Sequence, residues 1–151
     1  MNWRSIVIGS SIAVYLYLVI TEWVDLAPWN NVAASTSSQK LSGTLINLVP
    51  FGLLVLAFLF DLLWLKFVAI GILLAWLGVH FAWWWAPYLW GGASAEHMEQ
   101  YGRHFGSTFK FLPPRRGNPI PDAHYVTMHV LTLVNVVLAA FALIGGGGAR
   151  K

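Results

Sequence analysis

Apolar residues form four long stretches, at positions 5–24, 41–60, 67–88 and 123–144, separated by connecting segments of unequal length. A helix of about 20 residues, at 1.5 Å rise per residue, crosses the roughly 30 Å of hydrocarbon in a bilayer. Backbone groups inside lipid must be paired, and the sequence lacks the short alternating strands of a membrane β-barrel. The pattern therefore predicts an all-α integral membrane four-helix bundle that forms one domain over residues 1–151.

The connections between these stretches differ in length and chemistry. Residues 61–66 (DLLWLK) leave room only for a tight turn between the second and third helices. The longest connection, 91–122, lies between the third and fourth, and Ser94 is a candidate cap for an interfacial amphipathic helix there. A proline-rich segment at 113–121 predicts an extended, stiff cover. The expected helix has apolar residues recurring at helical spacing, namely Met98, Tyr101, Phe105 and Phe109, and an i,i+4 pair, Glu99 and Arg103.

Composition supports a membrane location. Hydrophobic residues make up 58% of the chain and charged residues 10%, and the mean hydropathy is +0.64. These values exclude a soluble enzyme, a nucleic-acid-binding protein and a disordered chain, so we expect a multi-pass protein with membrane lipid as its partner, in the cell membrane if the source is bacterial. Basic residues divide almost evenly between the two ends of the predicted helices, which leaves the orientation open. The absence of cysteine excludes disulfides and thiolate metal sites.

Several polar side chains interrupt the apolar stretches at similar depths. An ionisable group in lipid costs roughly 2.5–3.5 kcal/mol on insertion scales, so such groups are expected to face one another. Counted along each helix from the end nearest the 91–122 connection, Glu22, Asn47, His80 and His129 fall in the same leaflet. We therefore expect one polar pocket within that leaflet, roofed by residues 91–122.

Such a pocket favours binding of an amphiphilic, lipid-like molecule, and leaves open whether the protein also processes it chemically. For chemistry, His129 and Glu22 are the best general acid/base candidates, while His80 and Tyr15 would orient the reacting group. The arginines of the loop are expected to meet an anionic head group. The candidate ligand-binding residues are Asn47, Asp122, Tyr125, Thr132, Arg103, Arg115, Arg116 and Trp84.

Two other functions remain open at this stage. A non-enzymatic accessory subunit, or one protomer of a small oligomeric transporter, would use Gly71 and Gly78 to pack against a partner helix or a second copy. A b-type haem protein would use His80 and His129 as axial ligands. No metal site is predicted, because the sequence contains neither an HExxH motif nor zinc-finger spacing.

Two short features resemble the sterol-isomerase/sigma-2-receptor family. They are the carboxylate of Glu22 at the end of the first helix and the Asn-x-x-Pro-Phe sequence at 47–51, on a chain of similar length with four spans. Where the second helix of that family would carry a carboxylate, this chain has Asn47. The resemblance implies a scaffold that holds an amphiphilic ligand, and no residue role is carried over from it.

Overall fold

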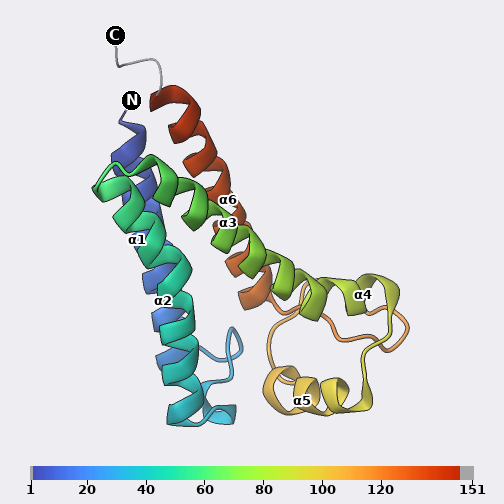
Figure 1. Cartoon of the computed structure of the whole chain (residues 1–151). Helices are drawn as coiled ribbons and strands as arrows, with labels where there is room; N and C mark the ends of the chain where they lie inside the picture. The colour runs from blue at the N-terminus through green and yellow to red at the C-terminus, as the bar shows by residue number, and fades with distance from the viewer. Residues whose placement is uncertain (1, 147–151) are drawn as a thin grey trace.

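The structure, a computed structural model, describes residues 2–146 and is helical, without strands, in that part of the chain. Four long helices make the body of the molecule, and short elements lie at one end of it (Figure 1). In chain order the elements are α1 (Trp3–Trp23), the 3-10 turn η1 (Val32–Ala34), α2 (Ser37–Leu59), α3 (Leu63–His80), the π-helical segment η2 (Phe81–Trp85), α4 (Ala86–Trp90), α5 (Ala95–Phe105) and α6 (Ala123–Gly146).

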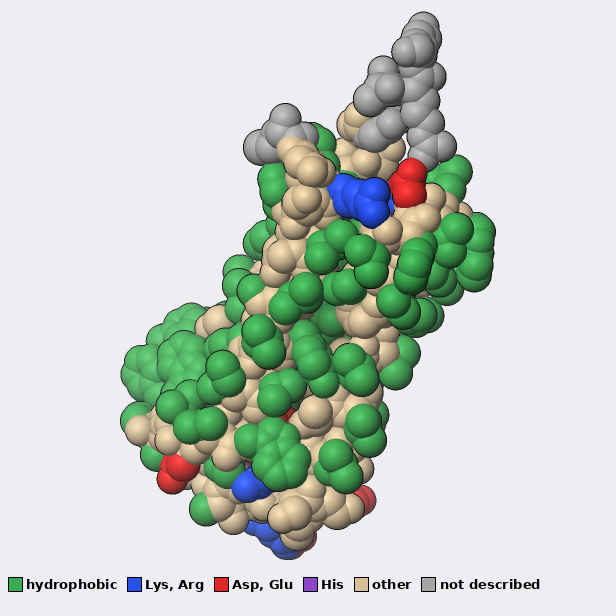
Figure 2. Space-filling view, turned by 90° about the vertical axis from the view of Figure 1, so that its left-hand side faces the viewer, with side chains coloured by type: hydrophobic (Ala, Val, Ile, Leu, Met, Phe, Trp, Pro, Cys, Tyr) green, Lys and Arg blue, Asp and Glu red, His purple; other side chains and the backbone are tan. Residues whose placement is uncertain are grey.

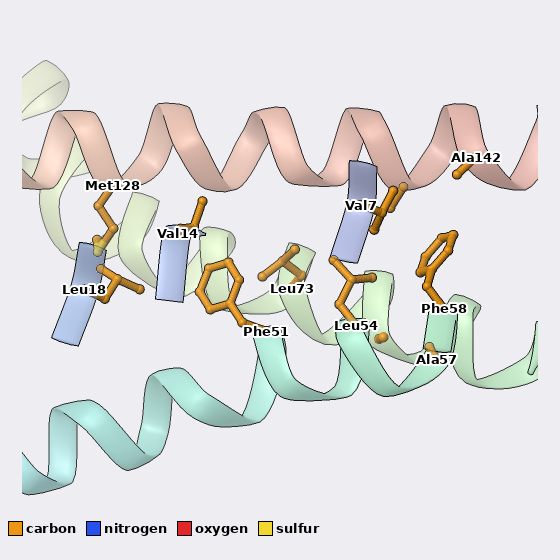
Figure 3. Packing of buried hydrophobic residues seen from close by; sticks show 12 residues of the cluster. Val7, Val14, Leu18, Phe51, Leu54, Ala57, Phe58, Leu73, Met128 and Ala142 are labelled. Atoms are coloured by element: carbon orange, nitrogen blue, oxygen red, sulfur yellow. The ribbon is translucent and has the colours of Figure 1, made fainter. Parts of the chain in front are cut away.

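The predicted bundle is confirmed, and each long helix contacts two others. Helix α1 packs against α2 and α6, and α3 also packs against both of them. Consecutive long helices run in opposite directions, and α1, α2 and the loop segments between them lie on one side of Figure 1. The core is an apolar cluster between the helices (Figure 3), made by Val7, Val14, Leu18, Phe51, Leu54, Ala57, Phe58, Ala69, Leu73, Met128, Ala139 and Ala142.

The outer surface of the bundle is apolar, as lipid contact requires. Four helices in the described part of the chain are long and apolar enough to cross a membrane. Large hydrophobic side chains remain exposed on them, including Val79, which is 68% exposed, and Phe60, which is 63% exposed. On the face seen in Figure 2, green side chains cover the middle of the molecule, and charged side chains lie mostly toward its two ends. Four such helices with this surface indicate a membrane protein.

A buried polar contact joins α1 to α6. The hydroxyls of Ser10 and Ser11 each donate to Oδ1 of Asn135 over 3.0 Å. Ser11 also donates to the carbonyl of Val7 at 2.7 Å, and Asn135 donates to the carbonyl of Leu131 at 3.1 Å. These polar groups are therefore satisfied within the bundle, which is what allows them to lie among apolar helices.

The turn between α2 and α3 forms where the sequence predicts it. Asp61 adopts a left-handed conformation with φ of 55°, and its carboxylate accepts a hydrogen bond from Nζ of Lys66 at 2.5 Å. The guanidinium of Arg4 donates to the carbonyl of Leu59, in the last turn of α2, at 2.5 Å. Cationic groups at a helix C-terminus satisfy its free carbonyls, so α1 and α2 are also connected through their ends.

The third membrane helix is longer than predicted and contains a π-helical segment. It runs continuously over Leu63–Trp90, instead of 67–88, with η2 between α3 and α4. In this segment the Ala86 N–H donates to the carbonyl of Phe81, five residues earlier. Pro87 follows directly, and a proline ring clashes with the carbonyl four residues before it in a regular α-helix. Widening the helix ahead of Pro87 relieves that clash.

The 91–122 connection is partly as predicted. Ser94 caps α5 by accepting the His97 N–H at 3.1 Å, which confirms the predicted start of this helix. Phe109 was expected on the same helix but lies beyond it, because α5 ends at Phe105. A Cβ at Gly106 would lie 2.5 Å from the Gly102 carbonyl, so this position fits only glycine.

The proline-rich segment is not extended throughout. It turns back at Arg116 and Gly117, which have φ of 50° and 75°, and the Asn118 N–H donates to the Arg115 carbonyl at 2.8 Å. The prediction of an extended cover is wrong at this turn, because two consecutive left-handed residues reverse the chain.

Candidate functional site

A polar cavity of about 90 Å³ lies at the end of the bundle that carries the long connection. Glu22 reaches it from the last turn of α1, and Asp122 from the residue before α6. Helix α2 passes close to the Glu22 carboxylate at Gly43, where an added Cβ would lie 2.8 Å from Oε1. The lining residues are Thr21, Glu22, Asn30, Asn31, Val32, Ser35, His104, Phe105, Thr108, Asp122, His124 and Tyr125.

A second, aromatic cavity of about 300 Å³ lies beside α3 and η2. Five of its six lining side chains are aromatic rings, counting the imidazole of His80, and the sixth is the exposed Val79. The larger helix radius of η2 places consecutive tryptophans along this wall. The lining residues are Val79, His80, Trp83, Trp84, Phe105 and Tyr125.

Phe105 and Tyr125 line both cavities and form the wall between them. Their rings meet edge to face, with centroids 5.4 Å apart and an interplanar angle of 83°. Trp84, only 2% exposed, packs against both, with centroid distances of 4.7 Å to Phe105 and 4.3 Å to Tyr125. Edge-to-face packing of aromatic rings is favourable beyond the area it buries, so this wall is a stable part of the site.

Trp29, Tyr17 and His124 form a hydrogen-bonded chain that ends at the lining of the polar cavity. The indole N–H of Trp29 donates to the hydroxyl oxygen of Tyr17 at 3.1 Å, and Tyr17 lies 3.0 Å from Nδ1 of His124. When the Tyr17 hydroxyl donates to Nδ1, a neutral His124 carries its proton on Nε2, on the ring that lines the cavity.

Asp122 both caps α6 and contributes a carboxyl group to the polar cavity. Its Oδ1 accepts the Tyr125 N–H at 2.9 Å, as an N-cap residue does, and the side chain is 1% exposed. Burial raises the pKa of this carboxyl above its ordinary value, although hydrogen bonds from Tyr125 and Thr108 and the charge of Lys110 act in the opposite direction. Lys110 is itself held by the carbonyls of Phe105 and Thr108.

The connection is fixed over the polar cavity by backbone and side-chain bonds. The Phe109 N–H donates to the Pro28 carbonyl at 2.7 Å, and the Ala123 N–H donates to the Phe109 carbonyl at 2.9 Å. Asn31 donates to the His104 carbonyl at 3.2 Å, which connects the loop after α1 to α5. The roof predicted over the site is therefore an ordered segment held at several points.

Next to the aromatic cavity, α3, η2 and α6 bring four rings together. Trp76 and His80 stack with centroids 4.0 Å apart, and His80 meets His129 edge to face at 5.5 Å. The Trp85 indole donates to Nδ1 of His129 at 3.1 Å. Because an indole N–H can only donate, His129 must accept at Nδ1, and the neutral ring carries its proton on Nε2.

This donor arrangement does not fit the haem alternative. A histidine that ligates a metal through Nε2 needs a lone pair there and donates its Nδ1–H to a neighbouring acceptor. Trp85 imposes the opposite tautomer on His129, so its Nε2 offers a proton in place of a lone pair. Among residues 2–146, no three His, Asp or Glu side chains are grouped so that they would hold a metal ion.

Some predicted site residues come together, in two cavities where the sequence suggested one pocket. Glu22 and Asp122 line the polar cavity, His80 and Trp84 line the aromatic one, and Tyr125 lines both. His129 lies behind this lining, in ring contact with His80 and Tyr125.

Other predicted residues lie outside both cavities. Tyr15 packs against the apolar core, Asn47 is half-buried on α2, and the Thr132 hydroxyl donates to the Met128 carbonyl at 2.8 Å. The remaining ones are the loop arginines, which are exposed: Arg103, Arg115 and Arg116. Arg103 pairs with Glu99 at 2.9 Å, as predicted. An anionic head group held by these arginines would therefore not enter either cavity.

Sequence reasoning missed 11 of the 16 residues that line the two cavities. Asn30 binds the carbonyls of Thr21 and Val24 at 2.7 and 2.8 Å, which closes the end of α1, and no local pattern predicts that role. Trp76 and Trp85 are not among the predicted site residues; the Trp76 ring stacks on His80 within α3, and the Trp85 indole N–H donates to Nδ1 of His129 on α6. Gly71 and Gly78 lie on the exposed face of α3, and the partner helix expected there stays a prediction.

Comparison with known proteins gives no relative. No family model, no curated protein and no solved structure matches this chain. The short features that resemble the sterol-isomerase/sigma-2-receptor family therefore have no family match behind them, and the fold and the two cavities are the basis for a functional assignment.

Proposed function

We propose that this membrane protein binds an amphiphilic ligand across its two adjoining cavities. The observation that carries the proposal is the shared wall: Phe105 and Tyr125 each line a polar cavity on one side and an aromatic cavity on the other. A ligand with a polar end and an apolar end matches that change of lining over a short distance. Pockets of this kind, mostly apolar with a few polar groups, are typical ligand sites.

The charges of the lining residues limit the class of ligand that can bind. Neither cavity is lined by lysine or arginine, whereas Glu22 and Asp122 both reach the polar one. An anion placed beside two carboxylates without a basic partner would be repelled and poorly solvated. The proposed ligand therefore does not carry an anionic head group, in contrast to the expectation from the loop arginines.

Binding is better supported than catalysis. Glu22 lines the polar cavity, whereas His129 lies behind the rings of the aromatic one with Nδ1 already engaged by Trp85. A general acid and a general base must both reach the same substrate within hydrogen-bond distance. Glu22 lines the polar cavity and His129 lines neither cavity, so the proposal includes no chemical step.

The test uses a substitution that fills part of the aromatic cavity from its exposed rim. Val79→Phe adds a ring at a side chain that lines the cavity but is 68% exposed, and Val130→Phe is the matched control at a 54% exposed position on α6. Thermal unfolding in lipid nanodiscs is measured with oleyl alcohol and with oleate at equal mole fractions. Ligand binding to the folded state raises Tm by mass action.

We expect oleyl alcohol to raise the Tm of the wild type and of Val130→Phe, and to raise that of Val79→Phe much less. Oleate should have a smaller effect on all three proteins. An equal response of Val79→Phe and Val130→Phe, or no response of the wild type to oleyl alcohol, would contradict the proposal.

A further inference from the structure

Three buried ring nitrogens beside the aromatic cavity have no hydrogen-bond partner. They are Nε1 of Trp76, Nδ1 of His80 and Nε2 of His129, and the described part of the chain has one further such atom, on His97. Their rings form one cluster, with centroids 4.0 Å apart for Trp76 and His80, 5.5 Å for the two histidines, and 6.5 Å for Trp76 and His129. Buried polar atoms are nearly always paired, so this group requires an explanation.

Two of these three atoms are hydrogen-bond donors. The indole nitrogen of Trp76 can only donate, and the bond from Trp85 to Nδ1 of His129 leaves the His129 proton on Nε2. His129 is 8% exposed, so water does not reach this group freely. What Trp76 and His129 lack is therefore an acceptor, and a further donor would satisfy neither of them.

The aromatic cavity meets this cluster at His80. His80 lines the cavity and lies in ring contact with both Trp76 and His129. On the other sides, flat rings bound the cavity, namely those of Trp83, Trp84, Phe105 and Tyr125. Flat rings on several sides favour a planar guest that stacks against them or meets their edges.

We propose that the part of the ligand in the aromatic cavity is a planar, conjugated carbonyl group, such as a quinone ring, whose oxygen supplies the acceptor missing from the Trp76–His80–His129 cluster. A carbonyl oxygen accepts hydrogen bonds and donates none, which matches the unpaired donors of Trp76 and His129. Such a ring carries no negative charge, which suits a lining without lysine or arginine. This inference rests on the proposed function and specifies the class of molecule that binds there.

The experiment compares two ligands that differ in the carbonyl groups. Binding of decyl-1,4-benzoquinone and of decylbenzene is measured by equilibrium partition into protein-loaded nanodiscs, with empty nanodiscs subtracted. We expect the wild type to bind the quinone about threefold to tenfold more tightly, the range for one or more hydrogen bonds formed in place of unpaired groups. Trp76→Phe should lose most of this preference, while Trp64→Phe, at a 64% exposed tryptophan of the same helix, should keep it.

A second measurement does not depend on the folding of a variant. In the wild type labelled with 15N-histidine, the Nε2 resonance of His129 should shift when the quinone is added and not when decylbenzene is added. Equal affinity for the two ligands, a preference that survives in folded Trp76→Phe, or an unmoved His129 resonance would overturn the carbonyl assignment. If the carbonyl assignment fails but oleyl alcohol still stabilises the wild type and not Val79→Phe, the proposal of amphiphile binding stands. If oleyl alcohol does not stabilise the wild type either, both proposals fail.

Discussion

Trp85 donates its indole N–H to Nδ1 of His129 over 3.1 Å, and this bond connects η2 to α6 at the back of the aromatic cavity. Trp85 is the last residue of this π-helical segment, which widens the helix ahead of Pro87 and changes the direction of the side chains that follow His80. The bond fixes the tautomer of His129, and with it the donor that the ring presents toward its neighbours. A local departure from α-helix thus sets the chemistry of a residue on another helix.

Removal of this bond is expected to weaken the contact between η2 and α6. Trp85→Phe keeps an aromatic side chain but removes the donor, and should lower the free energy of unfolding by about 1 kcal/mol, the usual net contribution of one hydrogen bond. Reversible unfolding in mixed micelles measures the change. Trp90→Phe is the control, because Trp90 is 72% exposed. Equal stability of the two variants would show that the bond contributes nothing measurable.

The contact between α1 and α6 should depend on Asn135. Asn135→Leu removes the acceptor shared by Ser10 and Ser11, whose hydroxyls still reach the Val7 carbonyl. We expect a loss of about 0.6 to 1.7 kcal/mol, from the average to the largest value measured for hydrogen bonds between membrane helices. Val134→Leu, at a 46% exposed position of α6, controls for the change in side-chain volume. A stability loss no greater than that of the control would contradict the prediction.

Stability should depend on pH through Asp122. Burial raises the pKa of its carboxyl in the folded state, whereas an unfolded aspartate titrates near about 3.9. Below that value the group is protonated in both states. As pH rises through the folded pKa, the folded protein must ionise a buried carboxyl, and stability is lost relative to a neutral side chain.

Asp122→Asn tests this dependence, because asparagine is also a good N-cap residue. The Tm of the variant minus that of the wild type should become more positive between pH 4 and pH 7 in detergent. A difference that stays constant, or one that becomes more negative with rising pH, would contradict the assignment of a raised pKa.

The close approach of α2 to Glu22 should show in a pair of glycine substitutions. Alanine is favoured over glycine in a helix by roughly 1 kcal/mol, so Gly71→Ala, with open space around it, should raise stability by up to that amount. Gly43→Ala should gain less, because its Cβ would displace the Glu22 carboxylate. The same variant should weaken binding of oleyl alcohol, since Glu22 lines the polar cavity. Equal gains in stability for both substitutions would argue against a close contact.

The membrane fold was predictable because its causes are local in the sequence. Each apolar stretch is long enough to cross a bilayer, and backbone groups in lipid must be paired within the helix. The Ser94 cap and the Glu99–Arg103 pair were predictable for the same reason, because each joins residues within one helical turn. The depth of Glu22 and His80 along their helices likewise followed from counting residues.

The arrangement of the site was decided only by tertiary packing. Depth along a helix does not give its rotation, so Asn47 shares the predicted leaflet with Glu22 but lies outside both cavities. The division into a polar and an aromatic cavity comes from Phe105 and Tyr125, which meet from α5 and α6. Side-chain contacts between residues far apart in the chain depend on how whole helices pack, and a periodic pattern within one helix does not contain that information.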